Sequence, residues 1–197
     1  MSEECPPARR LDPPPHDFWI FAYGSLMWDP GFAHREAQPA RLIGWHRAFC
    51  LYSERYRGTP ERPGLVLGLD RGGSCLGRAY KVSAADGPTV AAYLDHREML
   101  GGAYDPRWVK IRFVDGRHVR AWTYLIDRSC SQYAGRLQLD RVAEVIAHAA
   151  GQRGSNVDYL VNTVRHLDEI GIAESALHDV LERVQQLIAQ PAREGGG

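Results

Sequence analysis

The chain has 197 residues, 44% of them hydrophobic and 24% charged, a composition typical of a globular protein with a single domain. Basic and acidic residues number 24 each, so the formal net charge of +0 gives no general attraction to nucleic acid or to a membrane surface. No stretch reaches the length of a transmembrane helix, and we expect neither a membrane nor a nucleic acid as partner.

Four cysteines stand far apart, at Cys5, Cys50, Cys75 and Cys130. They form no C-x-x-C pair, which argues against a structural zinc site and against a thioredoxin-type redox pair. The first residues carry no apolar segment of the kind that directs secretion. We therefore expect reduced, mostly buried thiols in a cytoplasmic protein.

Several common site motifs do not occur in the sequence. The eight histidines show no metal-ligand spacing, and there is no P-loop or G-x-G-x-x-G fingerprint. His96 and Glu98 fit the H-x-E half of a zinc deaminase signature, but the P-C-x-x-C half is missing. We expect no metal ion and none of the common nucleotide cofactors.

Residues 1–16 are rich in proline and contain little that a core could bury, so we expect an extended or disordered lead-in. One domain is expected over 17–191, and the glycine-rich end, 192–197, is expected to be a flexible tail. Within the domain, the apolar run over 18–23 predicts a buried strand that breaks at Gly24-Ser25.

This break has two interpretations. Glycine permits backbone angles closed to other residues and lets a ligand approach the main chain closely, so the backbone N–H groups at Gly24-Ser25 could bind a carboxylate. The alternative is a core strand that leaves through an ordinary turn, and the local pattern does not decide between the two.

Five further strands are predicted by alternating or apolar runs, over 41–53, 65–69, 75–82, 108–114 and 118–126. The second and third of these flank a glycine-rich turn at 70–74. The last two flank Asp115-Gly116, and Asp-Gly between alternating runs is among the strongest hairpin signals. The sequence therefore predicts two β-hairpins in this region.

One helix is predicted between the hairpins, over 87–100, and three follow in the C-terminal third. The first of the three is built on the apolar spacing from Leu139 to Ala149. The second is capped by Ser155, and the third runs over 177–188. This order predicts an α+β fold: a small mixed β-barrel of about six strands, one inserted helix and a C-terminal group of packed helices.

The inserted helix carries a charged pair at its end. Val90, Tyr93 and Leu94 share one apolar face, and the next turn of that face reaches Arg97 and Glu98. Periodicity does not decide which of the two points inward. Glu98 is either a surface carboxylate paired with an arginine or a partly desolvated general base, and the pattern leaves both open.

Three separated motifs, in this order, carry a resemblance to a known family: FAYGSLMWDPGF, then GWHRAFCLYSERYRGTPERPG, then YLDHREMLGGAYDP. Together they resemble the ChaC family of γ-glutamylcyclotransferases, over nearly the whole chain from Phe18. The resemblance implies a small mixed β-barrel with packed helices and an inserted catalytic helix. It also implies a cytoplasmic, cofactor-independent lyase that degrades reduced glutathione to 5-oxoproline and cysteinylglycine.

The resemblance also implies roles for particular residues. Glu98 matches the family's catalytic glutamate, a general acid/base for attack of the substrate's α-amine on its own γ-amide. Tyr104 and the 55–64 loop match walls of the substrate pocket. The remaining matches form the family's substrate loop, whose backbone amides would hold the γ-glutamyl α-carboxylate: Tyr23, Gly24, Ser25, Leu26, Met27 and Trp28.

Three alternatives remain open at this point. The same fold could act on other γ-glutamyl-amino acids or γ-glutamylamines. The loop could belong to a non-catalytic γ-glutamyl or glutathione-binding protein, although binding alone does not require Glu98. A serine hydrolase using Ser25 is a weaker alternative, because A-Y-G-S-L departs from the G-x-S-x-G pattern. The sequence predicts no oligomeric state.

Overall fold

The computed structural model describes residues 5, 10–98 and 103–189. The chain divides into two compact units. One consists of Met1–Ala48 and Leu67–Tyr133, and the other of Phe49–Val66 and Ala134–Gly197. In the described part of the first unit one α-helix, α1 (Gly87–Glu98), accompanies the strands, and the second unit is mainly helical.

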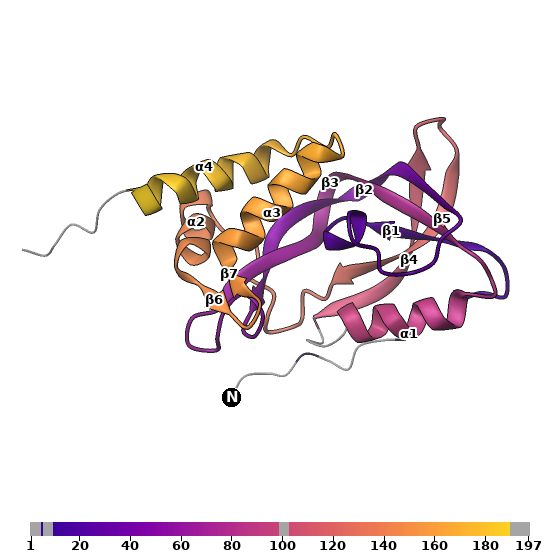
Figure 1. The fold of residues 1–197 in the computed structure, drawn as a ribbon, viewed down its shortest axis with the longest axis horizontal. Helices are drawn as coiled ribbons and strands as arrows, with labels where there is room; N and C mark the ends of the chain where they lie inside the picture. Colours follow the sequence, from indigo (N-terminus) through magenta and orange to yellow (C-terminus); the bar gives the residue numbers. More distant parts are fainter. Residues whose placement is uncertain (1–4, 6–9, 99–102, 190–197) are drawn as a thin grey trace, which may run out of the picture. The chain divides into compact units, whose positions relative to one another are not determined.

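Five strands form a closed barrel in the order β1-β3-β2-β4-β5, with most of their residues in the first unit (Figure 1). They are β1 (Phe18–Ala22), β2 (Glu36–Ser53), β3 (Gly64–Val82), β4 (Tyr104–Phe113) and β5 (His118–Ile126). Strand β1 pairs antiparallel with β3 and parallel with β5, which closes the barrel and makes it mixed. The predicted α+β class with a small mixed barrel is confirmed.

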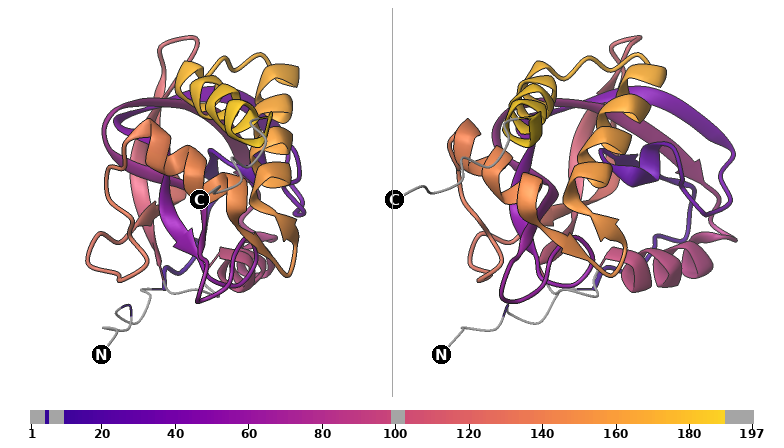
Figure 2. Two further views of the ribbon diagram at one scale, coloured as in Figure 1. Left: turned by 90° about the vertical axis from the view of Figure 1, so that its left-hand side faces the viewer. Right: turned by 60° about the vertical axis from the view of Figure 1, so that its left-hand side comes forward.

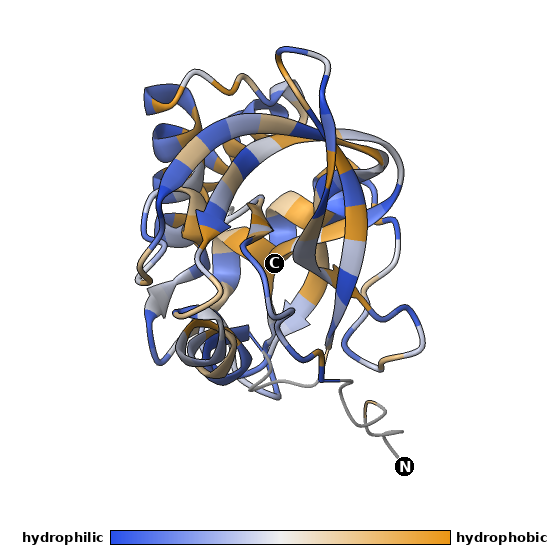
Figure 3. Ribbon diagram, turned by 90° about the vertical axis from the view of Figure 1, so that its right-hand side faces the viewer, coloured by the Kyte–Doolittle hydropathy of each residue, from blue (hydrophilic) through white to orange (hydrophobic). Residues whose placement is uncertain are grey.

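The barrel interior is apolar. All five residues of β1 are buried: Trp19 and Phe21 belong to the interior cluster, and Phe18 packs against the rings of Trp108 and Trp122. The longer strands alternate between hydrophobic and hydrophilic residues, as the colours along their ribbons show (Figure 3). The interior cluster draws on every strand and includes Phe21, Leu42, Leu69, Ile111 and Ala121.

The first predicted hairpin is wrong. Residues 64–82 form one continuous strand, β3, and the glycine-rich segment lies inside it. Gly72 and Gly73 take positive φ values of 102° and 65°, a conformation that serves a β-bulge as well as a hairpin turn. Two predicted strands therefore merge, and the barrel has five strands where about six were predicted.

The second predicted hairpin is confirmed. Strands β4 and β5 pair antiparallel from Tyr104↔Ile126 to Arg112↔His118. Gly116 in the connecting turn has a φ of 86°, so glycine is needed at this position.

The three predicted C-terminal helices are also confirmed, as α2 (Leu139–His148), α3 (Asn156–Glu169) and α4 (Ser175–Ala189). Each packs against the other two, and Figure 2 shows them grouped together. Ser155 caps α3 by accepting a hydrogen bond from the Asp158 backbone N–H at 2.9 Å. Strands β6 (Ala150–Gly151) and β7 (Gly154–Ser155) pair as a separate two-stranded sheet.

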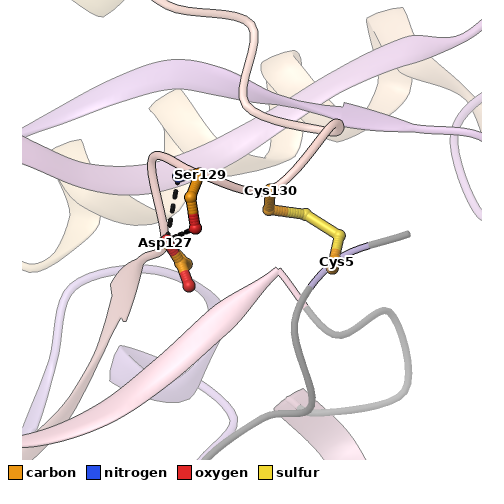
Figure 4. The surroundings of a disulfide bond; sticks show 4 residues. All are labelled: Cys5, Asp127, Ser129 and Cys130. Carbon is orange, nitrogen blue, oxygen red and sulfur yellow. Dashed lines mark hydrogen bonds between the residues drawn. A yellow bond between two sulfur atoms is a disulfide. The ribbon is translucent and has the colours of Figure 1, made fainter. Parts of the chain in front are cut away.

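The expectation of four reduced thiols is wrong for two of them. Cys5 and Cys130 form a disulfide across 125 residues of sequence, with their Cα atoms 4.3 Å apart (Figure 4). The turn that presents Cys130 is held by Asp127, whose carboxylate accepts hydrogen bonds from the backbone N–H and hydroxyl of Ser129. Cys50 and Cys75 are buried thiols, as expected. In the part of the chain that the structure describes, no helix combines the length and hydropathy needed to span a membrane.

Candidate active site

The predicted substrate loop begins where β1 ends. A short 3-10 turn, η1 (Ser25–Met27), follows Gly24. Its shape is set by backbone hydrogen bonds from Met27 N to Gly24 O at 2.8 Å and from Asp29 N to Ser25 O at 2.9 Å. The side chains of Leu26 and Met27 are buried, so these residues anchor the turn in the core.

Gly24 has open space beside it. A Cβ atom built on this residue would meet no protein atom within 4 Å. Its φ of −130° is a value that other residues also adopt, so the glycine is not required for a left-handed conformation. The space beside Gly24 is compatible with close approach of a ligand to the main chain, and the carboxylate-binding interpretation of this break stays a prediction.

Arg47 on β2 holds the loop from the barrel side. Its side chain is buried, its Nε donates to the backbone oxygen of Tyr23 at 2.5 Å, and its Nη2 donates to the Leu76 oxygen at 2.8 Å. The same nitrogen lies 3.8 Å from the sulfur of Met27, whose backbone oxygen accepts a bond from the Tyr80 hydroxyl at 2.7 Å. This side of the loop is therefore fixed largely through backbone carbonyls.

Arg97, in the last turn of α1, holds the loop from the helix side. Its Nη2 donates to the Ser25 hydroxyl at 2.9 Å, and its Nη1 donates to the Asp29 backbone oxygen at 2.9 Å. The same Nη1 also bonds the Tyr93 hydroxyl, one turn earlier on the helix, at 2.7 Å. One guanidinium thus joins to α1 both Ser25, the first residue of η1, and Asp29, just beyond its end.

Glu98 follows Arg97 and is the last described residue of α1. Its side chain is 18% exposed, and its Oε1 lies 3.5 Å from the Arg97 Nε. Burial raises the pKa of Glu98 above its ordinary value, and the positive charge of Arg97 offsets part of that rise. A carboxyl with a raised pKa is suited to exchanging protons close to neutral pH.

Two further titratable groups belong to this region. Tyr124 on β5 is buried, and its hydroxyl donates a long hydrogen bond of 3.4 Å to Asp95 Oδ1 on α1. Burial raises the pKa of Tyr124, and the carboxylates of Asp95 and Glu98 raise it further, so the phenol stays protonated. Burial also raises the pKa of Asp95.

The structure thus brings Ser25 and Glu98 to the same arginine, although they are 73 positions apart in the sequence. Tyr104 is the first residue of β4, and its hydroxyl donates to the Leu67 backbone oxygen at 2.7 Å. Trp28 ends the η1 turn and is half-buried. Positions 99–102, which complete the predicted REMLGG motif, lie outside the described residues.

The 55–64 segment belongs to the second compact unit. There, Arg57 donates from Nη1 to the backbone oxygens of Arg153 at 2.7 Å and Ser155 at 3.2 Å. Its predicted part as a pocket wall remains a prediction.

Sequence reasoning missed the roles of Arg47 and Tyr124 and named Arg97 only as a possible partner of Glu98. The available signal for a buried Arg47 is its place just before the largely apolar run AFCLY in the predicted strand over 41–53. A buried charge needs hydrogen-bonding partners, so such a position indicates contacts with other parts of the chain. Nothing local marks Tyr124. Within the described residues, no group of three or more His, Cys, Asp or Glu side chains is placed to hold a metal ion.

Comparison with known proteins gives consistent matches. The family model described as "ChaC-like protein" matches residues 18–187. The chain is 37% identical to the glutathione-specific gamma-glutamylcyclotransferase of Escherichia coli (strain K12), covering 90% of this chain and 77% of that protein. It is 31% identical to glutathione-specific gamma-glutamylcyclotransferase 1 of Homo sapiens, covering 77% of this chain and 70% of that protein.

Solved structures agree on the fold. A crystal structure of a yeast γ-glutamylcyclotransferase specific to glutathione superimposes with a TM-score of 0.78 at 22% identity. The match covers 87% of this chain and 96% of that one. The motifs, the barrel and the family match over 18–187 lead to one assignment: the chain belongs to the ChaC-like protein family.

Proposed function

We propose that this protein is a lyase that cleaves reduced glutathione to 5-oxoproline and cysteinylglycine. The observation that carries the proposal is the placement of Glu98, a partly buried carboxyl with a raised pKa that shares Arg97 with the substrate loop. The names of the Escherichia coli and human relatives support glutathione as the substrate.

The reaction is an intramolecular cyclisation of the substrate. The α-amine nitrogen of the γ-glutamyl group attacks the γ-amide carbon of the same molecule, the new C–N bond closes a five-membered ring, and the old C–N bond to cysteine breaks. Because nucleophile and electrophile belong to one molecule, holding the bent conformer supplies much of the rate, up to roughly 7–11 kcal/mol in favourable intramolecular cases.

In this proposal Glu98 moves the protons. Its carboxylate takes a proton from the substrate ammonium, so that the amine becomes nucleophilic, and returns a proton to the departing amine of cysteinylglycine. General acid–base catalysis of this kind contributes about 10²–10⁴-fold. The Tyr124 phenol, which stays protonated, does not compete for that proton at neutral pH.

The substrate loop binds in this proposal, and Ser25 is not a nucleophile. The open space beside Gly24 admits a substrate group to the main chain, where backbone N–H groups of residues 24–26 hold the α-carboxylate. The Ser25 hydroxyl is already engaged by Arg97, which keeps it oriented. Tyr104 and the side chain of Trp28 are proposed as pocket walls.

The test compares wild type with Glu98→Gln, which keeps the shape of the side chain and removes the base. We expect wild type to form 5-oxoproline from reduced glutathione and the variant to lose at least about 10²-fold in kcat. Chromatography measures the product, and Glu144→Gln, an exposed glutamate on α2, is the matched control. Equal rates in Glu98→Gln and wild type would reject Glu98 as the acid/base.

The substrate class has one alternative with an observation in its favour. A relative from Arabidopsis thaliana, 30% identical over 87% of this chain, is named gamma-glutamylcyclotransferase 2-3, without mention of glutathione. A panel of γ-glutamyl-amino acids and γ-glutamylamines, compared with glutathione by kcat/KM, decides between the two. We propose a cytoplasmic location, as the family resemblance implies, and cell fractionation tests it.

A further inference from the structure

The contacts of Arg97 go beyond those of a surface arginine. Its side chain is 21% exposed and its two terminal nitrogens donate to three oxygens: the Ser25 hydroxyl, the Asp29 backbone oxygen and the Tyr93 hydroxyl. Its Nε faces the Glu98 carboxylate at 3.5 Å. A planar guanidinium can serve all four at once because its donors point in fixed, diverging directions.

This arrangement places one residue between the two parts of the proposed site. The loop that would hold the substrate carboxylate comes from the end of β1, and the general base comes from the end of α1. In the described part of the chain, the hydrogen bonds that join Ser25 and Asp29 to α1 all come from Arg97. A shift of this side chain would therefore move the loop relative to the base.

We propose that Arg97 is a positioning residue with two separable actions. Its hydrogen-bonding fork fixes the substrate loop against α1, and its positive charge holds Glu98 in a state able to accept a proton at neutral pH. This inference rests on the proposed function of Glu98 and of the loop, and adds a residue to which neither the family resemblance nor the comparisons assign a role.

The charges around Glu98 support the second action. On its own helix it faces Arg97, which is the group that opposes the rise in its pKa caused by burial. From β5 it faces Tyr124, a neutral phenol, which in turn bonds Asp95 on α1. Asp29 lies on the far side of Arg97, with Oδ2 4.0 Å from Nη1. Among these groups Arg97 carries the positive charge, so its removal leaves burial unopposed.

Two substitutions separate the two actions. Arg97→Lys keeps a positive charge but not the fork, since an ammonium cannot reproduce the diverging planar donors. Arg97→Gln removes both. We expect Arg97→Lys to raise KM about tenfold, as for the loss of one charged hydrogen bond, with the acidic limb of the pH profile of kcat/KM close to that of wild type.

For Arg97→Gln we expect the same rise in KM and, in addition, a shift of the acidic limb to higher pH by about one unit, the usual effect of a neighbouring arginine on a carboxyl. The sign follows from the base: Glu98 acts as a carboxylate, and a higher pKa means that a higher pH is needed to form it. Arg35→Gln, an exposed arginine paired with Asp17 at 3.0 Å, is the matched control and should change neither quantity.

Ser25→Ala tests whether the fork acts through the loop. If it does, Ser25→Ala and Arg97→Lys each raise KM, and the double variant raises it by less than the product of the two factors. If the KM of the double variant rises by the full product of the two single factors, the action of the fork through the loop is rejected. If the acidic limb of folded Arg97→Gln does not move, the electrostatic action on Glu98 is rejected. A uniform loss of kcat at every pH in both Arg97 variants would reduce Arg97 to a purely structural residue.

A second measurement keeps this inference apart from the proposed function. The pKa of Glu98 can be followed by ¹³C NMR of its carboxyl group in folded protein without substrate. A higher pKa in Arg97→Gln than in wild type supports the electrostatic action even if wild type forms no 5-oxoproline, in which case the proposed function alone fails. An unchanged pKa rejects that action even if wild type is active.

Discussion

The substrate loop is held from two sides that differ in chemistry. On the barrel side, Arg47 is 4% exposed and donates to the backbone oxygens of Tyr23 and Leu76. On the helix side, Arg97 is 21% exposed and bonds the side chain of Ser25 while facing Glu98. Both residues are arginines, and both contact the segment 23–29, although at different residues.

The difference lies in what each guanidinium satisfies. Arg47 donates hydrogen bonds to one buried and one partly buried carbonyl, so it contributes to the stability of the folded state. Arg97 stands beside a titratable carboxyl whose pKa is raised by burial, so its contribution changes with the protonation of Glu98. The barrel side therefore stabilises the loop, whereas the helix side links the loop to the carboxyl that we propose as the acid/base.

The largest expected effect is on the barrel side. Arg47→Ala removes this donor from the buried Tyr23 carbonyl and from the partly buried Leu76 carbonyl, and loss of a partner by a buried polar group costs about 1–3 kcal/mol. We expect the free energy of unfolding in urea to fall by about 2–5 kcal/mol. Arg41→Ala on the same strand is the control, because Arg41 is exposed and bonds Ser74, and it should change the value by less than about 0.5 kcal/mol. Equal effects of the two substitutions would contradict the structural role of Arg47.

Local chemistry made much of the fold predictable from the sequence. Asp115-Gly116 specifies a tight turn within four residues, and Ser155 and Asp158 mark the start of α3 through a contact between near neighbours. The apolar spacing of the C-terminal helices likewise depends on neighbours three and four positions apart. The continuous strand β3 was missed because glycines at positive φ serve turns and bulges alike.

The site was predictable only in part. Glu98 and the 23–28 loop were named as site residues through the family motifs, because periodicity left the inward residue of the Arg97–Glu98 pair undecided. The contact of Arg97 with Ser25 spans 72 positions, and the Cys5–Cys130 bond spans 125. Such pairings are set by how the barrel closes and leave no local pattern. The role of Arg47 was hidden for the same reason, since its partners lie on two other segments.

An effect of intermediate size is expected at Gly24, which lies in the loop between the contacts of Arg47 and those of Arg97. Gly24→Ala adds a methyl group that meets no protein atom, so the free energy of unfolding should change by less than about 1 kcal/mol. The methyl group enters the space proposed for the substrate, and we expect KM for glutathione to rise about tenfold, which is 1.4 kcal/mol. Gly77→Ala is the contrasting variant: its Cβ would lie 2.7 Å from the Phe21 ring, so it should destabilise the fold. An unchanged KM in Gly24→Ala would place the substrate elsewhere.

The smallest expected effect is that of Glu98→Gln on stability. It has the opposite sign from that of Arg47→Ala and tests the contrast between the two sides. The folded protein raises the pKa of Glu98, so it binds this proton more tightly than the unfolded chain does. The stability that Glu98 contributes is therefore complete below its ordinary pKa and is lost as the pH rises through the raised value.

Glutamine does not ionise, and Arg97 in the Glu98→Gln variant keeps its bonds to Ser25, Asp29 and Tyr93. We expect Glu98→Gln to raise Tm at pH 7 by about 2–4 °C, roughly 1 kcal/mol for a chain of this size, and to leave Tm unchanged near pH 4. A variant less stable than wild type at pH 7 would mean that the Arg97–Glu98 pair stabilises the fold, and the helix side would then resemble the barrel side.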